Sequence, residues 1–378
     1  MNRVNVPKLR FPGFDGAWEE KKLQEVSSFL DGRRKPIKSG DRSKMKGEYP
    51  YYGASGIIDY VNNYIFDEEL ILLGEDGENI ISRNSPLAFR VSGKCWINNH
   101  AHVIVPKDNT NIDFLTHNLE RINYVVYNTG TAQPKLNQEV CRNIPSWFPT
   151  LPEQQKIASF LSAVDEKIQQ LSRKKELLEH YKKGVMQQLF SDKLRFKDEK
   201  GKDYPDWEEK KLGEISNIKK GQQLNKIELT DSGEFLCING GISPSGYTDK
   251  FNTLENTITI SEGGNSCGFI NFFRCKFWSG GHNYTIEIIK PEETDNYFMF
   301  QILKHNQINI MGLRVGSGLP NIQKKDLFAF LIKLPTSIKE QQKIANFLSS
   351  IDAKIENTIG ELEKVQLFKK GLLQKMFV

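Results

Sequence analysis

His100 and His102 are the two histidines, among six in the chain, that stand close enough in sequence to share one site. Alternate residues of a strand point to the same face, so both imidazoles could reach one metal ion. No cluster of cysteines or carboxylates joins them, and His100 recurs as His282 when WINNH is compared with WSGGH. We therefore predict no metal site and expect the recurring histidines to make structural hydrogen bonds.

We assign no catalytic motif to the chain. We predict that the chain lacks a G-x-x-x-x-G-K-[ST] phosphate loop, a G-x-G-x-x-G fingerprint, an H-E-x-x-H pair, a G-x-S-x-G elbow and the [DN]-P-P-[YF] tetrapeptide of amino-methyltransferases. The cysteines form no C-x-x-C pair, so we expect reduced, buried thiols. They are Cys95, Cys141, Cys237, Cys267 and Cys275.

Residues 31–47, DGRRKPIKSGDRSKMKG, hold seven basic side chains against two acidic ones. Gly and Pro favour a loop, and a basic loop can neutralise DNA phosphates with release of counterions. A loop that is merely solvated is the alternative. The basic candidates for DNA binding are Arg33, Arg34, Lys35, Lys38, Arg42, Lys44 and Lys46.

Two further pairs of stretches combine cations with amides, which are the groups that read base edges. Asn and Gln suit adenine, whereas Arg and Lys suit guanine. IKKGQQLN takes the place of the basic loop in the second half, and GTAQPKLN from Gly130 is echoed by GSGLPNIQ from Gly316. The candidates there are Gln133, Lys135, Asn137, Lys219, Lys220, Gln222, Gln223, Asn225, Asn321, Gln323, Lys324 and Lys325.

The elements that must position these side chains occur in duplicate. EQQKIASFLSAVDEKI, from Glu153, and EQQKIANFLSSIDAKI, from Glu340, are identical at twelve of sixteen positions. WEEKKL, KLRF and a Pro-Thr dipeptide also occur twice, and every pair lies 182 to 189 residues apart. The order is cyclic, since KLRF follows both the first EQQK segment and the N-terminus. We predict a pseudo-twofold internal repeat with the two termini close together.

Each EQQK segment begins a predicted long helix. Apolar residues at Ile157, Leu161 and Val164 continue in steps of four and three as a heptad seam, which the second copy repeats. Neither 153–190 nor 340–377 contains proline, so each can form roughly 33–37 helical residues, about 50–55 Å. A twofold relation predicts that the two helices pack antiparallel as a coiled coil.

The repeated polar positions of these helices need a separate explanation. A spacer needs only its apolar seam, and its outer face can drift. Identity on the polar face predicts instead that one external partner is bound twice. The partner-docking candidates are Glu153, Gln154, Gln155, Lys156, Phe160, Asp165, Glu340, Gln341, Gln342, Lys343, Phe347 and Asp352.

Between these landmarks the two halves diverge. Both are rich in Gly, Asn, aromatic and β-branched residues, which predicts short strands with tight turns. We therefore expect an α+β fold of two globular domains separated by the two helices. The predicted segments are a globular domain at 1–150, a helix at 151–191, a globular domain at 192–337 and a helix at 338–378.

Length and composition fit this division. A chain of 378 residues exceeds one ordinary core. Its 38% hydrophobic and 26% charged residues are typical of globular proteins, and no apolar run reaches the ~18–20 residues that cross a bilayer. The N-terminus lacks the apolar region of a signal peptide, so we expect a cytoplasmic protein. A net charge of +5 is compatible with a nucleic-acid partner.

Three motifs together resemble the specificity subunit of a type I restriction–modification system. They are the two E-Q-Q-K-I-A-x-F-L-S-x-[VI]-D-x-K-I helices, G-T-A-Q-P-K-L-N, and the opening L-R-F-P-G-F-x-G-x-W-E. The resemblance covers essentially the whole chain. One departure is GSGLP from Gly316, which keeps only the glycine and the proline of G-T-A-Q-P, and we interpret it as a variant of the same loop.

The resemblance implies how the parts work. The domains at 1–150 and 192–337 would be target-recognition domains, each reading one part of a split, asymmetric DNA target. The helices would dock two methyltransferase subunits, and motor-nuclease subunits would join the full complex. This chain would have no catalytic site and no cofactor. S-adenosylmethionine would belong to the adenine-N6 methyltransferase, and ATP and Mg to the motor-nuclease.

Two other functions stay open on the sequence. One is a stand-alone DNA enzyme with an unrecognised site. The other is a coiled-coil scaffold that binds no DNA.

Overall fold

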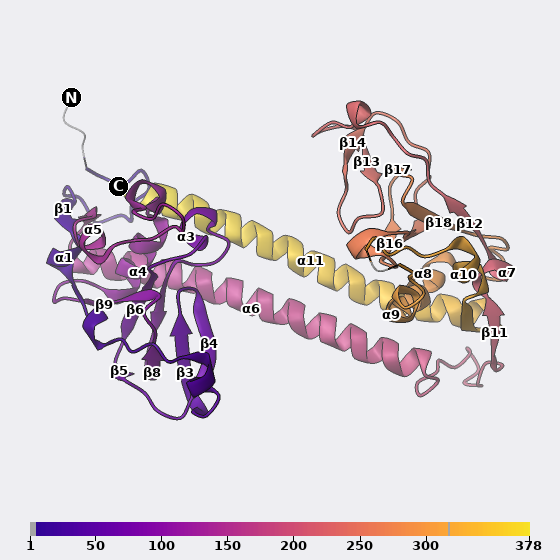
Figure 1. Cartoon of the computed structure of the whole chain (residues 1–378), viewed down its shortest axis with the longest axis horizontal. Coiled ribbons are helices and arrows are strands. Elements are labelled where there is room, and N and C mark those ends of the chain that lie inside the picture. Colours follow the sequence, from indigo (N-terminus) through magenta and orange to yellow (C-terminus); the bar gives the residue numbers. More distant parts are fainter. Residues whose placement is uncertain (1–4, 317) are drawn as a thin grey trace. The chain divides into compact units, whose positions relative to one another are not determined.

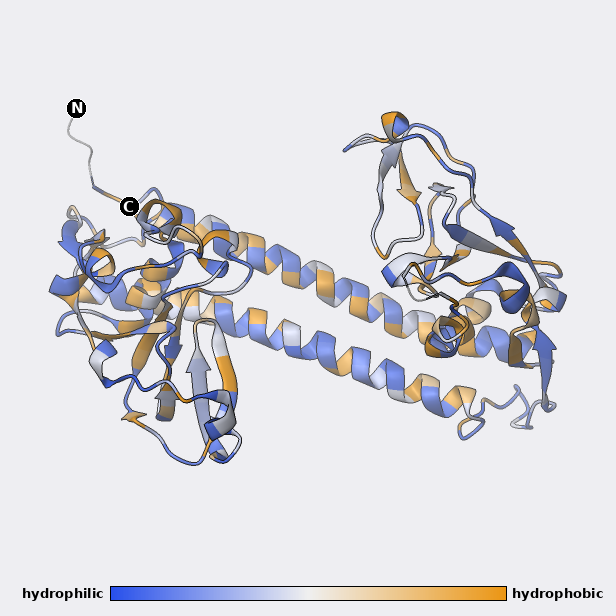
Figure 2. Ribbon diagram, in the orientation of Figure 1, coloured by the Kyte–Doolittle hydropathy of each residue, from blue (hydrophilic) through white to orange (hydrophobic). Residues whose placement is uncertain are grey.

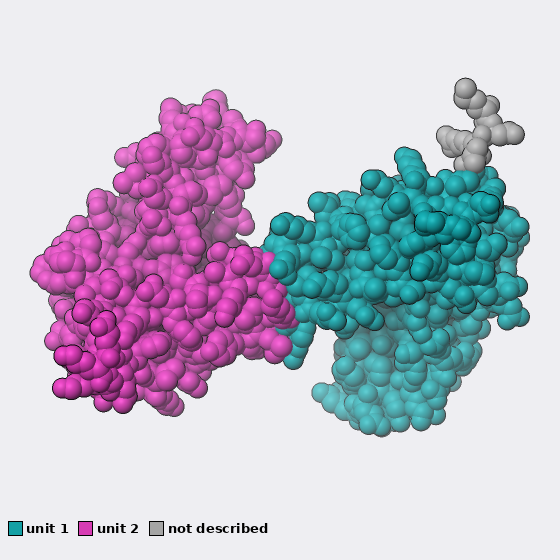
Figure 3. Space-filling view, turned by 180° about the vertical axis from the view of Figure 1, so that it is seen from behind, with its two compact units in different colours: residues 1–173, 359–378 teal, residues 174–358 magenta. Residues whose placement is uncertain are grey.

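A computed structural model describes residues 5–316 and 318–378 and divides into two compact units (Figures 1 and 3). Unit 1 comprises residues 1–173 and 359–378, and unit 2 comprises residues 174–358. Each unit therefore contains one half of each long helix. The predicted segment boundaries at 150/151, 191/192 and 337/338 remain a prediction.

Unit 1 is built from short strands and small helices. A two-stranded ribbon pairs β1 with β10, one antiparallel sheet has the order β2-β9-β6-β7, and a second sheet has the order β4-β3-β8-β5. The strands are β1 Glu19–Lys22, β2 Ser27–Phe29, β3 Lys46–Gly53, β4 Gly56–Val61, β5 Phe66–Asp67, β6 Leu70–Gly74, β7 Ala88–Val91, β8 Lys94–Ile97, β9 Ala101–Pro106 and β10 Pro145–Phe148. The helices are α1 Leu23–Val26, α2 Ser39–Arg42, α3 Asn79–Ser82, α4 Ile112–Arg121 and α5 Gln138–Arg142, with 3₁₀ turns η1 Asp31–Arg33 and η2 Tyr124–Tyr127.

Unit 2 repeats this architecture. Its ribbon pairs β11 with β19, and its sheets have the orders β12-β18-β15-β16 and β14-β13-β17. The strands are β11 Trp207–Lys211, β12 Ser216–Lys220, β13 Phe235–Ile238, β14 Gly246–Thr248, β15 Thr257–Ser261, β16 Ile270–Phe273, β17 Phe277–Ser279, β18 Asn283–Ile288 and β19 Leu331–Pro335. The helices are α7 Leu212–Ile215, α8 Asn296–His305, α9 Gln307–Met311 and α10 Lys324–Ala329, with 3₁₀ turns η3 Lys226–Glu228 and η4 Gly264–Ser266.

The same local chemistry starts both units. In WEEKKL the tryptophan is buried, and the polar strand that follows pairs with β10 or β19. The backbone amide of Lys22 donates to Glu25, as that of Lys211 donates to Glu214, and this closes a capping box on the one-turn helix. The predicted repeat therefore extends to the ribbon, to the strand order of the four-stranded antiparallel sheet and to individual hydrogen bonds, whereas the second sheet has four strands in unit 1 and three in unit 2.

The long helices are α6, Leu151–Phe190, and α11, Ile338–Met376. α6 begins in unit 1 and ends in unit 2, whereas α11 begins in unit 2 and ends in unit 1, so they run antiparallel within each unit (Figure 1). Figure 2 shows apolar positions alternating with hydrophilic ones along both helices. The seam residues Ile157, Leu161 and Val164 are buried in the core of unit 1, where Leu372 and Met376 of α11 meet them. The predicted α+β class and antiparallel helices are confirmed.

The two ends of the chain approach each other within unit 1. The backbone amide of Leu9 donates to the carbonyl of Lys375 at 2.8 Å. The rings of Trp18 and Phe377 make an edge contact with centroids 6.1 Å apart. The prediction of neighbouring termini is therefore confirmed for the described residues.

Two local predictions were wrong. The basic stretch 31–47 is not one loop, because it contains η1 and α2 and ends in the first residues of β3. Four of the cysteine thiols are buried and unpaired, but Cys275 is exposed. Among the described residues, no helix combines the length and the apolarity of a membrane span.

Candidate nucleic-acid interface

In unit 1, residues from three distant segments meet at Glu75, which directly follows β6. Arg34 from the basic stretch places Nη1 2.6 Å from Glu75 Oε2. Lys135 from GTAQPKLN places Nζ 3.3 Å from the other carboxylate oxygen. The structure therefore brings together two predicted DNA-binding residues that are about a hundred positions apart. The carboxylate itself is mostly buried and holds both loops.

His102 and Asp31 lie beneath this carboxylate. His102 Nδ1 is 2.7 Å from Asp31 Oδ2, and its Nε2 is 2.9 Å from the carbonyl oxygen of Leu136. Both partners are acceptors, so both ring nitrogens carry hydrogen and the imidazole is cationic. Burial lowers the pKa of His102, but the hydrogen bonds and charge interactions with Asp31 and Cys141 together outweigh burial and raise the pKa to about 10. Burial raises the pKa of Asp31, yet the hydrogen bonds from His102 and Val103 hold the pKa below its usual value.

Asp31, Glu75 and His102 have the composition of a metal site, since their ligand atoms lie within 4.8 Å of one another. A doubly protonated imidazole has no lone pair to give to a cation. Gln138 Nε2 also donates to Asp31 Oδ2 at 2.6 Å. The donor set therefore fits a buried ion-pair network rather than a metal ion.

Unit 2 carries the equivalent carboxylate, Glu262, after β15. Lys220 Nζ lies 2.6 Å from its Oε1, and the hydroxyl of Tyr284 lies 3.1 Å from the same atom. His282 Nδ1 is 3.6 Å from Oε2. Tyr284 occupies the place of His102, and burial together with Glu262 raises its pKa to about 12. A different set of side chains therefore surrounds the same carboxylate.

Three backbone hydrogen bonds fix the frame identically in the two units. In unit 1 the amide of Glu75 donates to His100, that of Gly77 to Pro134, and that of Leu136 to Glu75. In unit 2 the corresponding pairs are Glu262 to His282, Gly264 to Pro320 and Ile322 to Glu262. All six donor–acceptor distances fall between 2.7 and 3.0 Å. Pro320 of GSGLP is therefore held as Pro134 of GTAQP is, which supports the variant-loop interpretation.

A cavity of about 580 Å³ opens beside Glu262. Lys220, His282 and Asn321 line it together with backbone of Gly240 and Gly263. Two of these five, Lys220 and Asn321, were predicted to bind DNA, and they come from strands and loops far apart in sequence. This cavity and the Glu75 cluster are the candidate interface.

The prediction that the chain has no G-x-S-x-G motif was wrong, since one lies at this cavity. Residues Gly264–Gly268 read GNSCG and so have the G-x-S-x-G spacing. The Ser266 hydroxyl donates to the carbonyl of Gly240 at 2.6 Å and lies 3.2 Å from the Ser261 hydroxyl. The serine sits in η4 between two antiparallel strands, not between a strand and a long helix, and no described hydrogen bond joins it to a histidine. The geometry does not activate it as a nucleophile.

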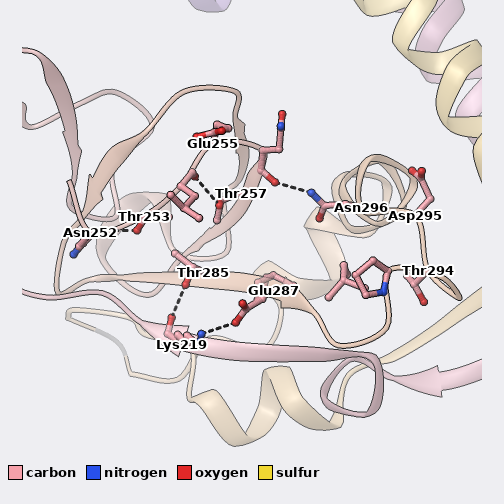
Figure 4. Close-up of a pocket in the computed structure, with 15 residues that line it drawn as sticks. Lys219, Asn252, Thr253, Glu255, Thr257, Thr285, Glu287, Thr294, Asp295 and Asn296 are labelled. Atoms are coloured by element: carbon pink, nitrogen blue, oxygen red, sulfur yellow. Dashed lines mark hydrogen bonds and ion pairs between the residues drawn. The ribbon is translucent and has the colours of Figure 1, made fainter.

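Lys219 lies on the other side of β12 from its neighbour Lys220, since alternate strand residues face opposite ways. It lines a second cavity of about 620 Å³ with Thr285 and Glu287 of β18 and with Asn296 of α8 (Figure 4). Its ammonium is paired with the Glu287 carboxylate. The structure therefore separates Lys219 from the residues at Glu262.

Three arginines of the basic stretch make ion pairs within unit 1. Arg34 is 14% exposed and also donates to the carbonyl of Ala101. Arg33 pairs with Glu68 and lies over the ring of Phe66. The third, Arg42, pairs with a carboxylate of β4. Arg34 is corrected to a structural residue because its side chain is mostly buried and its Nε and Nη1 already donate to Asp31, Glu75 and Ala101.

The remaining DNA-binding candidates are mostly exposed on separate elements. Lys35, Lys38, Lys44 and Lys46 surround α2 and the start of β3, and none of their described contacts reaches Glu75. Asn137 caps α5 through Glu139, and Gln323 donates to Asn321 at 2.8 Å. The others with exposed side chains are Gln133, Gln222, Gln223, Asn225, Lys324 and Lys325.

Four predicted partner-docking residues are instead buried inside the units, with exposed fractions of 0–2%. Glu153 receives two hydrogen bonds of 2.7 Å from Arg10, and Glu340 receives the same pair from Arg195. Gln154 and Gln341 each accept from the amide at the start of α4 or α8 and donate to the carbonyl before the long helix. These residues repeat because they clamp each helix to its own unit. The prediction that Glu153, Gln154, Glu340 and Gln341 face a partner was wrong.

Asp165 and Asp352 join the long helices to each other within their units. Asp165 pairs with Lys369 at 2.6 Å in unit 1, and Asp352 pairs with Lys182 at 2.7 Å in unit 2. Each aspartate lies 187 residues from the other, as does each lysine, so one interaction occurs twice. Tyr297 and Gln301 of α8 also donate to Asp352, whereas Asp165 stays 40% exposed.

Repeated residues of KLRF explain more of the helix identity. Arg10 and Arg195 belong to the two KLRF segments, and the hydrogen bonds to Glu153 and Glu340 raise their pKa above the usual value. The following phenylalanines pack edge-on against Phe160 and Phe347, at 5.6 and 5.8 Å between centroids. The sequence showed that KLRF and the EQQK helix are each repeated, but not that each KLRF segment packs against an EQQK helix. Gln155, Lys156 and Gln342 stay exposed, and Lys343 is half-buried.

Two exposed aromatic side chains on the long helices were missed. Tyr181 in unit 2 is 53% exposed and Phe368 in unit 1 is 52% exposed. They occupy equivalent positions of the repeat, beside Lys182 and Lys369, in the segments YKKGVM and FKKGLL. The repeated end of each helix was visible in the sequence, but only the structure shows that its aromatic residue is not part of the core.

The chain is similar to proteins of known family. The family model described as "Type I restriction modification DNA specificity domain" matches residues 16–180 and 204–367. The type I restriction enzyme MjaVIII specificity subunit of Methanocaldococcus jannaschii is 26% identical over 402 aligned positions, which cover 94% of this chain and 91% of that protein. A protein of Mycoplasma genitalium provisionally named a type I specificity subunit is 34% identical over 171 residues. That match spans 45% of this chain and 44% of the relative, less than half its length.

A solved structure supports the fold. The crystal structure of a type I restriction–modification system S subunit from M. genitalium superposes with a TM-score of 0.73. The superposition covers 99% of both chains at 20% sequence identity. At this identity the likeness shows the fold alone.

Proposed function

Because this chain belongs to the type I restriction–modification DNA specificity family, we propose that it selects the DNA sequence on which such a complex acts. Unit 1 and unit 2 would each read one half of a bipartite, gapped target. The globular parts, 1–150 and 192–337, would be the target-recognition domains, and 151–191 and 338–378 the spacer helices. The target would be asymmetric, since the units differ where they would meet DNA.

One observation carries the proposal. The two units hold the same carboxylate, Glu75 or Glu262, with the same three backbone hydrogen bonds, yet they surround it with different polar side chains. Two domains that read different base sequences need the same backbone frame with different hydrogen-bonding side chains on it. A scaffold that binds no DNA has no use for that difference.

The long helices would dock the partner subunits. Two adenine-N6 methyltransferase subunits would bind by similar contacts, one per unit, and motor-nuclease subunits would join the full complex. Gln155, Lys156 and Gln342 remain the candidates among the repeated polar residues, since they are exposed. Tyr181 and Phe368 join them.

The chain itself would be non-catalytic and bind no cofactor. Its relatives are named as specificity subunits, and Ser266, at the one motif of a nucleophile, lacks an activating base among the described hydrogen bonds. S-adenosylmethionine would bind the methyltransferase partner, and ATP and Mg the motor-nuclease.

Methylome sequencing of cells that carry this chain with its methyltransferase partner tests the proposal. We expect one bipartite adenine motif with a fixed gap, and exchange of residues 1–150 for another family member's domain should change one half only. A complex with proven methyltransferase activity and no such motif would overturn the assignment. Methylation or cleavage by the purified chain alone would favour the stand-alone enzyme instead.

A further inference from the structure

The residues at the candidate interface fall into a constant and an exchanged set. The constant set comprises Glu75 and Glu262, His100 and His282, and Pro134 and Pro320, which hold the frame through the backbone hydrogen bonds described above. A group kept in two readers of different sequences cannot be what distinguishes them. The base preference must therefore come from the exchanged positions on this frame.

In each unit, one pair of residues that differs between the units forms a β-bridge beside the constant glutamate and proline. Asp76 and Lys135 form an isolated antiparallel bridge in unit 1, and Gly263 and Asn321 form the same bridge in unit 2. Each pair immediately follows the constant glutamate on one side and the constant proline on the other. The two units thus carry different side chains at equivalent backbone positions.

The side chains of this bridge offer different hydrogen-bonding groups. Lys135 is 52% exposed and offers only donors, one of which faces Glu75 at 3.3 Å. Asp76 is 22% exposed and offers only acceptors; its carboxylate lies 2.8 Å from His100 Nδ1, which leaves its remaining lone pairs for a further donor. Asn321 offers both, and its Oδ1 accepts from Gln323 at 2.8 Å, which leaves Nδ2 and the second lone pair of Oδ1 directed elsewhere. Gly263 has no side chain, and the cavity of about 580 Å³ opens beside it.

These groups match opposite base pairs in the major groove. A G·C pair presents the acceptors O6 and N7 on guanine and the amino donor of cytosine, which suit Lys135 and Asp76. An A·T pair presents N7 and the amino group of adenine together, which suit an asparagine amide such as Asn321. Resting on the proposed function, we propose that the bridge pair sets one base pair of each half-site, G·C for unit 1 through Asp76–Lys135 and A·T for unit 2 through Asn321.

Reciprocal exchange of the bridge pair tests this assignment. The double variant Asp76→Gly with Lys135→Asn gives unit 1 the bridge of unit 2, and Gly263→Asp with Asn321→Lys does the reverse. The full chain, in complex with its methyltransferase partner, selects from DNA duplexes randomised in one half-site, and the methylome is sequenced in parallel. We expect one position of the affected half to change between G·C and A·T, with discrimination of about 5- to 150-fold, while the other half keeps its sequence.

Matched controls separate base reading from general binding. Lys135→Arg keeps a donor and should keep the G·C preference. Lys44→Ala removes an exposed cation away from the bridge and should weaken binding equally for all sequences. Neither control should change the selected bases.

The possible failures are distinguishable. A wild-type complex that selects no bipartite motif overturns the proposed function. A wild-type motif that neither double variant alters overturns the role of the bridge pair. So does loss of all selection by both variants with unchanged circular dichroism, because each bridge already exists on the same frame in the other unit.

Discussion

Glu153 is a repeated acidic residue at the start of a long helix, and its side chain is almost fully removed from solvent. Its two carboxylate oxygens are each 2.7 Å from the guanidinium of Arg10, which comes from a segment 143 residues earlier. A planar guanidinium and a carboxylate matched in this way form a bidentate pair, the strongest form of protein ion pair. Repetition of such a residue reflects the interior of each unit rather than a surface.

Removal of this carboxylate should be costly. Glu153→Ala leaves the Arg10 guanidinium partly buried without its counter-charge, so we expect the free energy of unfolding to fall by about 3 kcal/mol. Gln155→Ala, two residues along on the exposed side, should stay within about 0.5 kcal/mol. Urea denaturation followed by circular dichroism compares the two. Equal small effects would contradict the clamp.

His102 should make unit 1 sensitive to alkaline pH. Its pKa in the folded protein is about 10, above the value of about 6.5 in an unfolded chain. The raised pKa stabilises the folded state fully below about pH 6.5, and this contribution is lost as the pH rises toward 10. Asp31, whose pKa is lowered, acts in the opposite direction and loses its contribution only in acid.

Hydrogen exchange of unit 1 peptides measures this pH dependence. Protection in the wild type should fall between about pH 6.5 and 10 more steeply than in His102→Gln, which cannot titrate. Tyr284→Phe, at the equivalent place in unit 2, is the control because that hydroxyl titrates only near pH 12. Parallel pH profiles for the wild type and His102→Gln would contradict a protonated His102 in the folded protein.

At the scale of elements, each antiparallel long helix is divided between the two units. Unit 1 contains the start of α6 with the end of α11, and unit 2 contains the start of α11 with the end of α6. Both ends are repeated segments, so each unit holds one copy of each. A partner that recognises both segments would therefore find the same composite surface once in each unit.

The exposed aromatic residues give this surface a test. Aromatic side chains at the centre of interfaces commonly contribute most of the binding energy, so Phe368→Ala should weaken docking of a methyltransferase subunit on unit 1 by more than about 1 kcal/mol. Tyr181→Ala should do the same on unit 2. Native mass spectrometry should show each variant retaining one partner and the double variant retaining none.

Leu331→Ala serves as the control, since that side chain is equally exposed, at 53%, on β19. Both partners should remain bound to it. Full occupancy of both sites by the Phe368→Ala and Tyr181→Ala double variant would place the docking surface elsewhere.

At the scale of the whole molecule, the repeat is cyclic in space as well as in sequence. KLRF at residues 8–11 lies beside the end of α11, through Leu9 and Lys375, and KLRF at 193–196 directly follows the end of α6. At the first of these two places the chain ends meet only through noncovalent contacts, whereas at the second the helix and KLRF are joined by the continuous chain. The chain could therefore be opened at either one.

A circular permutant tests this equivalence. Val378 is joined to Met1 by a short linker, and the chain is opened between Ser191 and Asp192, so that Arg195 stays attached to the segment that reaches Glu340. We expect the same circular dichroism spectrum, a similar unfolding midpoint and the same methylated motif, since domains with neighbouring termini tolerate permutation. Opening the chain within β15, whose residues are mostly buried, should prevent folding. Failure of the first permutant with correct expression would contradict the equivalence.

The sequence by itself determined the repeat, the α+β class, the two long helices and the family. These follow from periodicity, from identity at a fixed offset and from local hydrogen-bonding preferences, all of which can be seen along a linear chain. Leu161 and Leu348, for example, are both predicted in the seam and fully buried.

Only the tertiary structure decided which repeated polar residues are free to bind. Glu153 and Gln155 are both repeated polar residues of the EQQK segment. In the structure Glu153 is buried against Arg10, whereas Gln155 is exposed. The meeting of Arg34 with Lys135 at Glu75 likewise depends on strands that pair across long loops. Burial and ion pairing are properties of neighbours in space, and for this chain those neighbours are often more than a hundred residues away.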